Sequence, residues 1–193
     1  MKEKIEEYAK KLQAKEYRLV SSYQNGYIGK NVFDVTLNDG TKRRIEQITK
    51  NHEDGDAVVI LPITKEGKIL IEVQSRPNLI DTNGVAVEFP AGMVDLDEDY
   101  VDAAKRELME ETGYVSNKFK ELEWHYQDQG CSNAIIKTFI ALDCEKKTEQ
   151  RLDDDEVLQP LEVTEEELLE LFNDKYINDA SSKIAILSYF NKK

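Results

Sequence analysis

The sequence predicts an α+β fold in which a mixed β-sheet lies between helices and is preceded by an antiparallel β extension. Residues 17 to 142 contain short segments rich in Val, Ile and Phe, and turn signals such as Asn25-Gly26 and Asp39-Gly40 separate them. A single helical pattern interrupts these segments, and two further helical patterns follow them. Strands with one helix between them and helices after them fit a sheet that is covered by helices.

The N-terminal part is predicted to form one short helix followed by strands. Apolar residues recur at helical spacing within residues 2 to 14. Residues 17 to 48 then read as strands, and a small sheet of this kind would leave an unpaired edge that a second copy of the chain can cover. A polar break begins at residue 51, so we expect an N-terminal extension over residues 1–50 and a second domain over residues 51–193.

The second domain is predicted to contain several strands, one internal helix and two helices at its end. Its strands are expected at residues 57–63, 68–76, 85–92, 119–126 and 133–142. The pair Thr164 and Glu167 has the spacing of a capping box and predicts a helix over residues 164–172. Residues 181–190 are predicted to form the last helix.

The internal helix has clear signals at both ends. Asp99 can accept hydrogen bonds from the free N–H groups of a first turn, and Gly113 stands where a left-handed residue would end the helix. Within the helix, Glu107 and Glu111 are four residues apart and therefore lie side by side. Two adjacent carboxylates repel each other in a bare helix, so this spacing indicates a site for a divalent cation.

The expected cofactor is Mg²⁺, with Mn²⁺ as an alternative, because hard cations take oxygen ligands. We expect Glu107, Glu111 and the backbone carbonyl of Ala91 to be ligands, with Glu110 as a further ligand or a neighbour of the ligands. Gly92 lets the chain bend sharply after Ala91 and bring that carbonyl to the same ion.

The stretch from Gly92 to Tyr114 fills every position of the pattern G-x5-E-x7-R-E-U-x-E-E-x-G-U, where U is apolar or aromatic. The chain therefore resembles the Nudix hydrolases, which cleave nucleoside diphosphates linked to another group. The resemblance implies the Nudix fold and catalytic roles for the box glutamates. In this frame Arg106 is expected to orient the glutamates as an ion-pair partner, and Glu98 to hold the loop or reach a metal through water.

Segments outside the box are similar to the ADP-ribose pyrophosphatase branch of this family. The matching patterns are Gln74-x-Arg76, an E-x-P-A-G lead from Glu88 to Gly92, and an acidic loop that ends at Glu156. The resemblance makes Glu156 a candidate for positioning or activating water. It also places Arg76, Glu88, Gly92 and Glu98 in the substrate-binding set. In that branch the leading sheet is commonly exchanged between two subunits, so we expect a homodimer.

The resemblance implies hydrolysis of ADP-ribose to AMP and ribose 5-phosphate. One departure keeps other nucleoside diphosphate sugars open: the branch usually has a proline before a glycine beyond the box, and this chain has Gln129 before Gly130. GDP-mannose and ADP-glucose are therefore alternative substrates. A further alternative is a nucleotide sensor without catalysis, but such a protein would be expected to have lost box carboxylates, and this chain has kept all of them.

The composition disfavours several classes of partner. The chain of 193 residues carries a formal net charge of −13, whereas nucleic acid and anionic membranes both need a basic surface. Its two cysteines give no disulfide framework, and no apolar run is long enough to span a bilayer. The charged N-terminus lacks the apolar core of a signal peptide, so we expect a cytoplasmic protein.

Four other side chains receive structural interpretations. His52 and His125 are too far apart in sequence to be recognised as a metal-binding pair, and we expect them to be surface or structural residues. Cys131 lies near the expected site, but its neighbours do not indicate an activated thiolate. Trp124 falls inside a predicted strand and is expected to lie in the core.

Overall fold

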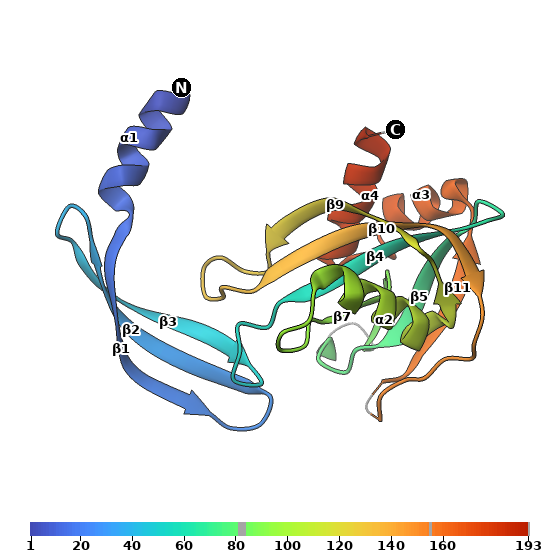
Figure 1. The fold of residues 1–193 in the computed structure, drawn as a ribbon, viewed down its shortest axis with the longest axis horizontal. Coiled ribbons are helices and arrows are strands. Elements are labelled where there is room, and N and C mark those ends of the chain that lie inside the picture. The colour runs from blue at the N-terminus through green and yellow to red at the C-terminus, as the bar shows by residue number, and fades with distance from the viewer. Residues whose placement is uncertain (81–83, 155, 193) are drawn as a thin grey trace. The chain divides into compact units, whose positions relative to one another are not determined.

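The computed structural model describes residues 1–80, 84–154 and 156–192, and the chain divides into two compact units (Figure 1). The first unit consists of Met1–Gly55 and Tyr126–Ala134, and the second contains Asp56–His125 and the chain from Ile135 onward. None of the described helices is long and apolar enough to cross a membrane.

The first unit contains one helix and a three-stranded antiparallel sheet. Its elements are α1 (Lys2–Leu12), β1 (Ala14–Gln24), β2 (Ile28–Leu37) and β3 (Lys42–Lys50), and the strands lie in the order β1-β2-β3. The two turns between the strands contain Gly26 and Gly40, whose φ angles of 75° and 87° suit glycine. Both hairpin turns predicted from the sequence are therefore confirmed.

A loop from later in the chain joins this unit. Ser132 forms an isolated parallel bridge with Ile48 of β3, and the Ile48 N–H donates to the carbonyl of Cys131 at 2.7 Å. Helix α1 buries none of its residues in the described chain, so its apolar stripe remains on the surface.

The second unit is built around an eight-stranded sheet. Its elements are β4 (Ala57–Thr64), β5 (Ile69–Ser75), β6 (Val85–Glu88), β7 (Ala91–Met93), α2 (Tyr100–Thr112), β8 (Tyr114–Val115), β9 (Lys118–Tyr126), β10 (Ile135–Lys146), β11 (Leu158–Val163), α3 (Glu165–Asn173) and α4 (Ala180–Asn191). The main path is β11-β5-β4-β10-β8, with β6 on β5, β7 on β4 and β9 on β10. Strands β4 and β10 are parallel while β4 and β7 are antiparallel, so the sheet is mixed, as the sequence predicts.

Helices cover both faces of this sheet (Figure 1). Ile69 and Ile71 of β5 pack in one core with Leu168 of α3 and Ile186 of α4. Leu70, between them in sequence, packs in the other core with residues of α2. This alternation follows from the strand period of two and confirms the predicted α+β sandwich.

Two sequence predictions need correction. The strand predicted over residues 85–92 is two strands, because Phe89 and Pro90 interrupt it: β6 pairs with β5, whereas β7 pairs with β4. Proline has no N–H to donate to a ladder, and the Pro90 carbonyl instead accepts from Ile60 N at 2.8 Å. Trp124 is not in the core, since it is 49% exposed on β9.

Candidate active site

Helix α2 has the caps that its sequence predicts. The Asp99 side chain accepts from Val101 N at 2.9 Å, and Gly113 ends the helix with a φ of 75°. Leu108 is fully buried against the sheet. Glu107 and Glu111 lie on a neighbouring face of the same helix and are also largely buried.

Arg106 connects the helix to the loop that precedes it. Its Nη1 donates to Glu107 at 2.6 Å and to Glu110 at 3.2 Å. Its Nε and Nη2 donate to Glu98 at 3.0 and 2.8 Å, and Nη2 also reaches the Met93 carbonyl at 2.9 Å. These acceptors raise the pKa of Arg106 further, so the guanidinium stays charged. Arg106 therefore fixes the positions of the carboxylates around it.

Glu98 is engaged with the loop and the helix. Besides its pair with Arg106, its Oε2 accepts from Asp95 N at 3.0 Å. The Arg106 hydrogen bonds lower the pKa of Glu98. The carboxylate is thus ionised and held in place, which fits the loop-holding interpretation better than direct contact with substrate.

Glu111 faces the strand that follows the predicted metal-binding turn. Its Oε2 accepts from Ala91 N at 2.9 Å. Burial raises the pKa of Glu111 well above its usual range, and the charges of Glu72 and Glu107 raise it further. Two of the expected ligand residues, Ala91 and Glu111, are therefore neighbours in space.

Gly92 is needed where it stands because of the Glu107 carboxylate. A Cβ atom at Gly92 would overlap the Glu107 side chain, so any larger residue would displace that carboxylate. Burial raises the pKa of Glu107 to about 7, and the neighbouring Arg106 opposes this shift.

Arg76 and Glu88 form an ion pair at the ends of β5 and β6. The Nε and Nη2 atoms of Arg76 both lie 2.8 Å from Oε1 of Glu88. Burial raises the pKa of Glu88, while Arg76 opposes this shift. Gln74, two residues before Arg76, is buried. The Arg76 side chain remains partly exposed and so could also reach a ligand.

Glu156 comes from the acidic loop before β11. Its Oε2 accepts from Asp153 N at 3.0 Å, and its side chain is half-buried. Its charge contributes to the raised pKa values of Glu107 and Glu111, so the loop brings it near the box glutamates. The preceding Asp155 lies outside the described residues.

Glu72 of β5 belongs to the same group, although sequence reasoning missed it. The residue is 1% exposed, and neither of its carboxylate oxygens has a hydrogen-bond partner among the described residues. Burial raises the pKa of Glu72 to about 8, and the charges of Glu88 and Glu156 add to this effect. The available signal was its position, because Glu72, Gln74 and Arg76 alternate along one face of a strand.

Several known proteins have sequences similar to this chain. Residues 54–183 match the NUDIX domain family. The chain belongs to the Nudix family. It is 36% identical over 156 residues to an ADP-ribose pyrophosphatase of Bacillus subtilis, with 80% of each chain covered. It is 30% identical over 170 residues to a GDP-mannose pyrophosphatase of Yersinia pestis, covering 83% of this chain and 82% of the relative.

A solved structure supports the fold of this Nudix protein. The crystal structure of an ADP compounds hydrolase superposes with a TM-score of 0.74 and covers 92% of this chain and 94% of the other. The two sequences are 19% identical, so this likeness concerns the fold alone.

The residues of the Nudix site fit a hard divalent cation. Carboxylate oxygens gather beside the Ala91-Gly92 backbone, and those of Glu72 are buried without a partner among the residues that the structure describes. Across residues 1–80, 84–154 and 156–192, however, no three His, Cys, Asp or Glu side chains are placed to hold an ion as they stand. Glu107 turns to Arg106 and Glu111 to Ala91 N. Mg²⁺ is commonly bound by only one or two protein carboxylates, and water and substrate phosphate provide its other ligands. A site with fewer than three protein carboxylates therefore fits this cation.

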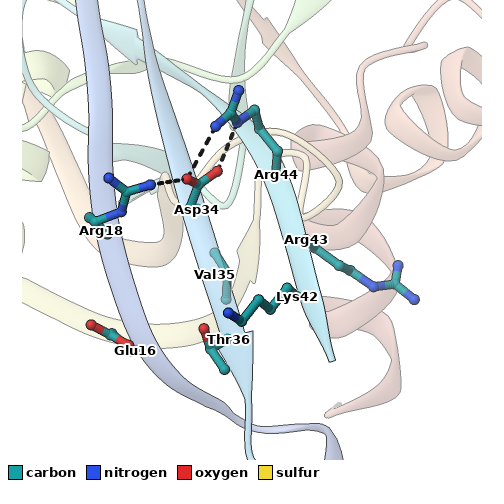
Figure 2. A pocket seen from close by; sticks show the side chains of 8 residues that line it. All are labelled: Glu16, Arg18, Asp34, Val35, Thr36, Lys42, Arg43 and Arg44. Carbon is teal, nitrogen blue, oxygen red and sulfur yellow. Dashed lines mark hydrogen bonds and ion pairs between the residues drawn. The ribbon is translucent and has the colours of Figure 1, made fainter. Parts of the chain in front are cut away.

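A separate hollow of about 530 Å³ lies on the N-terminal sheet of this Nudix protein and contains none of the predicted site residues (Figure 2). Arg18 and Arg44 both turn toward Asp34 there, and Arg44 Nε lies 2.8 Å from Asp34 Oδ1. The Arg44 guanidinium lowers the pKa of Asp34. The two arginines therefore share this carboxylate.

Proposed function

We propose that the protein hydrolyses a nucleoside diphosphate linked to a sugar, with ADP-ribose as the preferred substrate and Mg²⁺ as the cofactor. The observation that carries this proposal is the group of buried carboxylates beside the Ala91-Gly92 backbone, where Glu107 accepts from Arg106 and Glu111 accepts from Ala91 N. Relatives named for ADP-ribose and GDP-mannose cleavage support the substrate class.

The cation would be held by Glu107, Glu111 and the carbonyl of Ala91, with Glu110 nearby. When bound, it would neutralise the negative charge of the diphosphate and the charge that develops during reaction. Arg106 holds Glu107 and Glu110 in place through its paired hydrogen bonds. Mn²⁺ uses similar oxygen ligands and is an alternative cofactor.

The remaining residues would handle water and substrate. Glu156 would accept a proton from the attacking water, since the loop before β11 holds Glu156 close to Glu107. Arg76 would bind a phosphate or the terminal ribose, and Glu88 would orient it through their ion pair. Water adds to one phosphorus of the diphosphate and the bridging P–O bond breaks, which gives AMP and ribose 5-phosphate from ADP-ribose.

We further propose a homodimer that forms through the N-terminal sheet. Tyr17 and Leu19 of β1 are 64% and 54% exposed, and Ile45 of β3 is also exposed. Apolar side chains gathered on one small sheet favour a protein partner. Two free cysteines, Cys131 and Cys144, agree with a reducing compartment, and we propose the cytoplasm.

GDP-mannose is the second candidate substrate. Gln129 replaces the proline expected in ADP-ribose hydrolases, and the Yersinia pestis relative is named for GDP-mannose. A sensor without catalysis is disfavoured because the chain keeps every box carboxylate: Arg106 binds Glu98, Glu107 and Glu110, and Glu111 accepts from Ala91 N.

A substrate panel tests the proposal. ADP-ribose, GDP-mannose, ADP-glucose, diadenosine polyphosphates and NADH are each incubated with Mg²⁺, and the products are separated by chromatography. We expect ADP-ribose to have the highest kcat/KM and to yield AMP and ribose 5-phosphate. A hexose-linked nucleotide that exceeds ADP-ribose tenfold would overturn the substrate assignment, and tight binding without any turnover would favour the sensor.

A further inference from the structure

The face of strand β5 that carries Leu70 packs against helix α2. Leu70 packs with Ala104 and Leu108 of helix α2. Because side chains alternate along a strand, Glu72 is the next residue on the same face. Its charge is the largest neighbouring charge that acts on Glu111, one helical turn beyond Leu108. Glu72 therefore points toward the glutamate side of α2.

The Glu72 carboxylate is buried among other carboxylates. Both carboxylate oxygens are buried without a hydrogen-bond partner in the described chain. The nearby cation on its own face, Arg76, is paired with Glu88 instead. Leaving a buried carboxylate without a partner costs free energy whether it is charged or protonated. The charges around it come mostly from other carboxylates, namely Glu88, Glu156 and Glu107.

We propose that Glu72 is an additional ligand for the divalent cation, supplied by strand β5 from the sheet opposite the box glutamates of helix α2. A cation placed between the strand and the helix would satisfy its unpaired oxygens. This inference rests on the proposed cation dependence of the site. The ligands would then come from helix α2, from the turn at Ala91 and from strand β5.

The test measures Mn²⁺ alone, without substrate. Free Mn²⁺ is followed by electron paramagnetic resonance in titrations of the full chain, the Glu72→Gln variant and the Glu111→Gln variant. We expect Glu72→Gln to weaken Mn²⁺ binding at least about tenfold, since even residues that support metal ligands have effects of that size. Glu121→Gln is the matched control, because Glu121 is an exposed strand carboxylate paired with Lys137. It should bind Mn²⁺ like the unmodified protein.

Thermal unfolding in EDTA gives an independent readout. In Glu72→Gln, the rise in Tm on adding Mn²⁺ should be smaller than in the unmodified protein, because the amide is a poorer cation ligand than the carboxylate. Glu72→Asp, which keeps the charge on a shorter side chain, should retain more of the metal response than Glu72→Gln and shows whether charge or shape matters.

The outcomes separate the two proposals. If Glu111→Gln loses Mn²⁺ affinity while Glu72→Gln binds normally, the role of Glu72 is overturned and the box site stands. If the unmodified protein binds no Mn²⁺, or Glu111→Gln binds it normally, the proposed cation site itself fails.

Discussion

Glu111 combines a structural contact with a predicted catalytic role. Glu111→Gln keeps an oxygen that can accept from Ala91 N but removes the charge that attracts a cation. We expect kcat to fall at least about a hundredfold with folding intact, because charge stabilisation by a metal is worth several kcal/mol. Steady-state kinetics in Mg²⁺, with circular dichroism as the folding control, measures this. Near-normal turnover would remove Glu111 from the ligand set.

Arg76 tests the geometry of substrate recognition. Two of its nitrogens lie 2.8 Å from Glu88, so the planar guanidinium is already oriented. Arg76→Lys keeps the charge and loses the forked donor geometry. We expect the KM for ADP-ribose to rise several-fold with little change in kcat, if the contact forms in the ground state. A fall in kcat alone would place the contact in the transition state, and unchanged kinetics would return Arg76 to a surface role.

The ion pairs of Arg106 within the helix could be predicted from the sequence because these contacts are local. Arg106 meets Glu110 one helical turn away, as the spacing predicts. Glu72 was missed because its neighbours come from other elements: β6 lies beside it, α2 lies over it, and Glu156 enters from a distant loop. A single charged residue inside an apolar strand segment does not reveal which elements will surround it.

At the scale of elements, the helix caps could be predicted from the sequence, whereas the order of the strands in the eight-stranded sheet could not. Asp99, Gly113 and the Thr164 capping box mark helix ends through contacts within a few residues. By contrast, β4 pairs along most of its length with β10, which lies far along the chain, and its pairing with β5 is at Ile63 and Ile69, beside the turn that joins the two strands. The break at Pro90 also depends on this pairing, because each half of the predicted strand joins a different neighbour.

Two glycines at the ends of the box should respond differently to the same change. In Gly92→Ala, the new methyl group would overlap the movable end of the Glu107 side chain. The fold should survive while the carboxylate moves. We expect activity to fall at least about tenfold, since small misplacements at a reacting centre have large effects, with little change in Tm.

Gly113→Ala is the counterpart and should affect stability first. Gly113 has a φ of 75°, and a Cβ atom there would overlap the backbone carbonyl of Thr148, which cannot move aside easily. Strain at such a position costs about 1–3 kcal/mol, so thermal unfolding should show a clearly lower Tm. If Gly92→Ala unfolds as readily as Gly113→Ala, the assignment of Gly92 to the site rather than the fold is wrong.

For the whole molecule, the prediction that matters most is assembly. Sedimentation velocity at micromolar concentration should show a homodimer. Leu19→Glu places a charge among the exposed apolar residues of the N-terminal sheet and should yield monomer. Leu187→Glu, at an exposed position of α4, is the matched control and should leave the dimer intact. A monomer with full activity would reject the proposed role of the sheet.

The unpaired carboxylate of Glu72 links the lifetime of the folded protein to the concentration of divalent cation. A ligand that binds the native chain and not the unfolded chain adds stability by mass action, about 2.7 kcal/mol when it is present at a hundred times its Kd. A cation that binds the unpaired oxygens of Glu72 would act in this way. Free divalent cation would then govern resistance to proteases and the half-life at elevated temperature, and a chelator would hasten degradation even where no substrate is present.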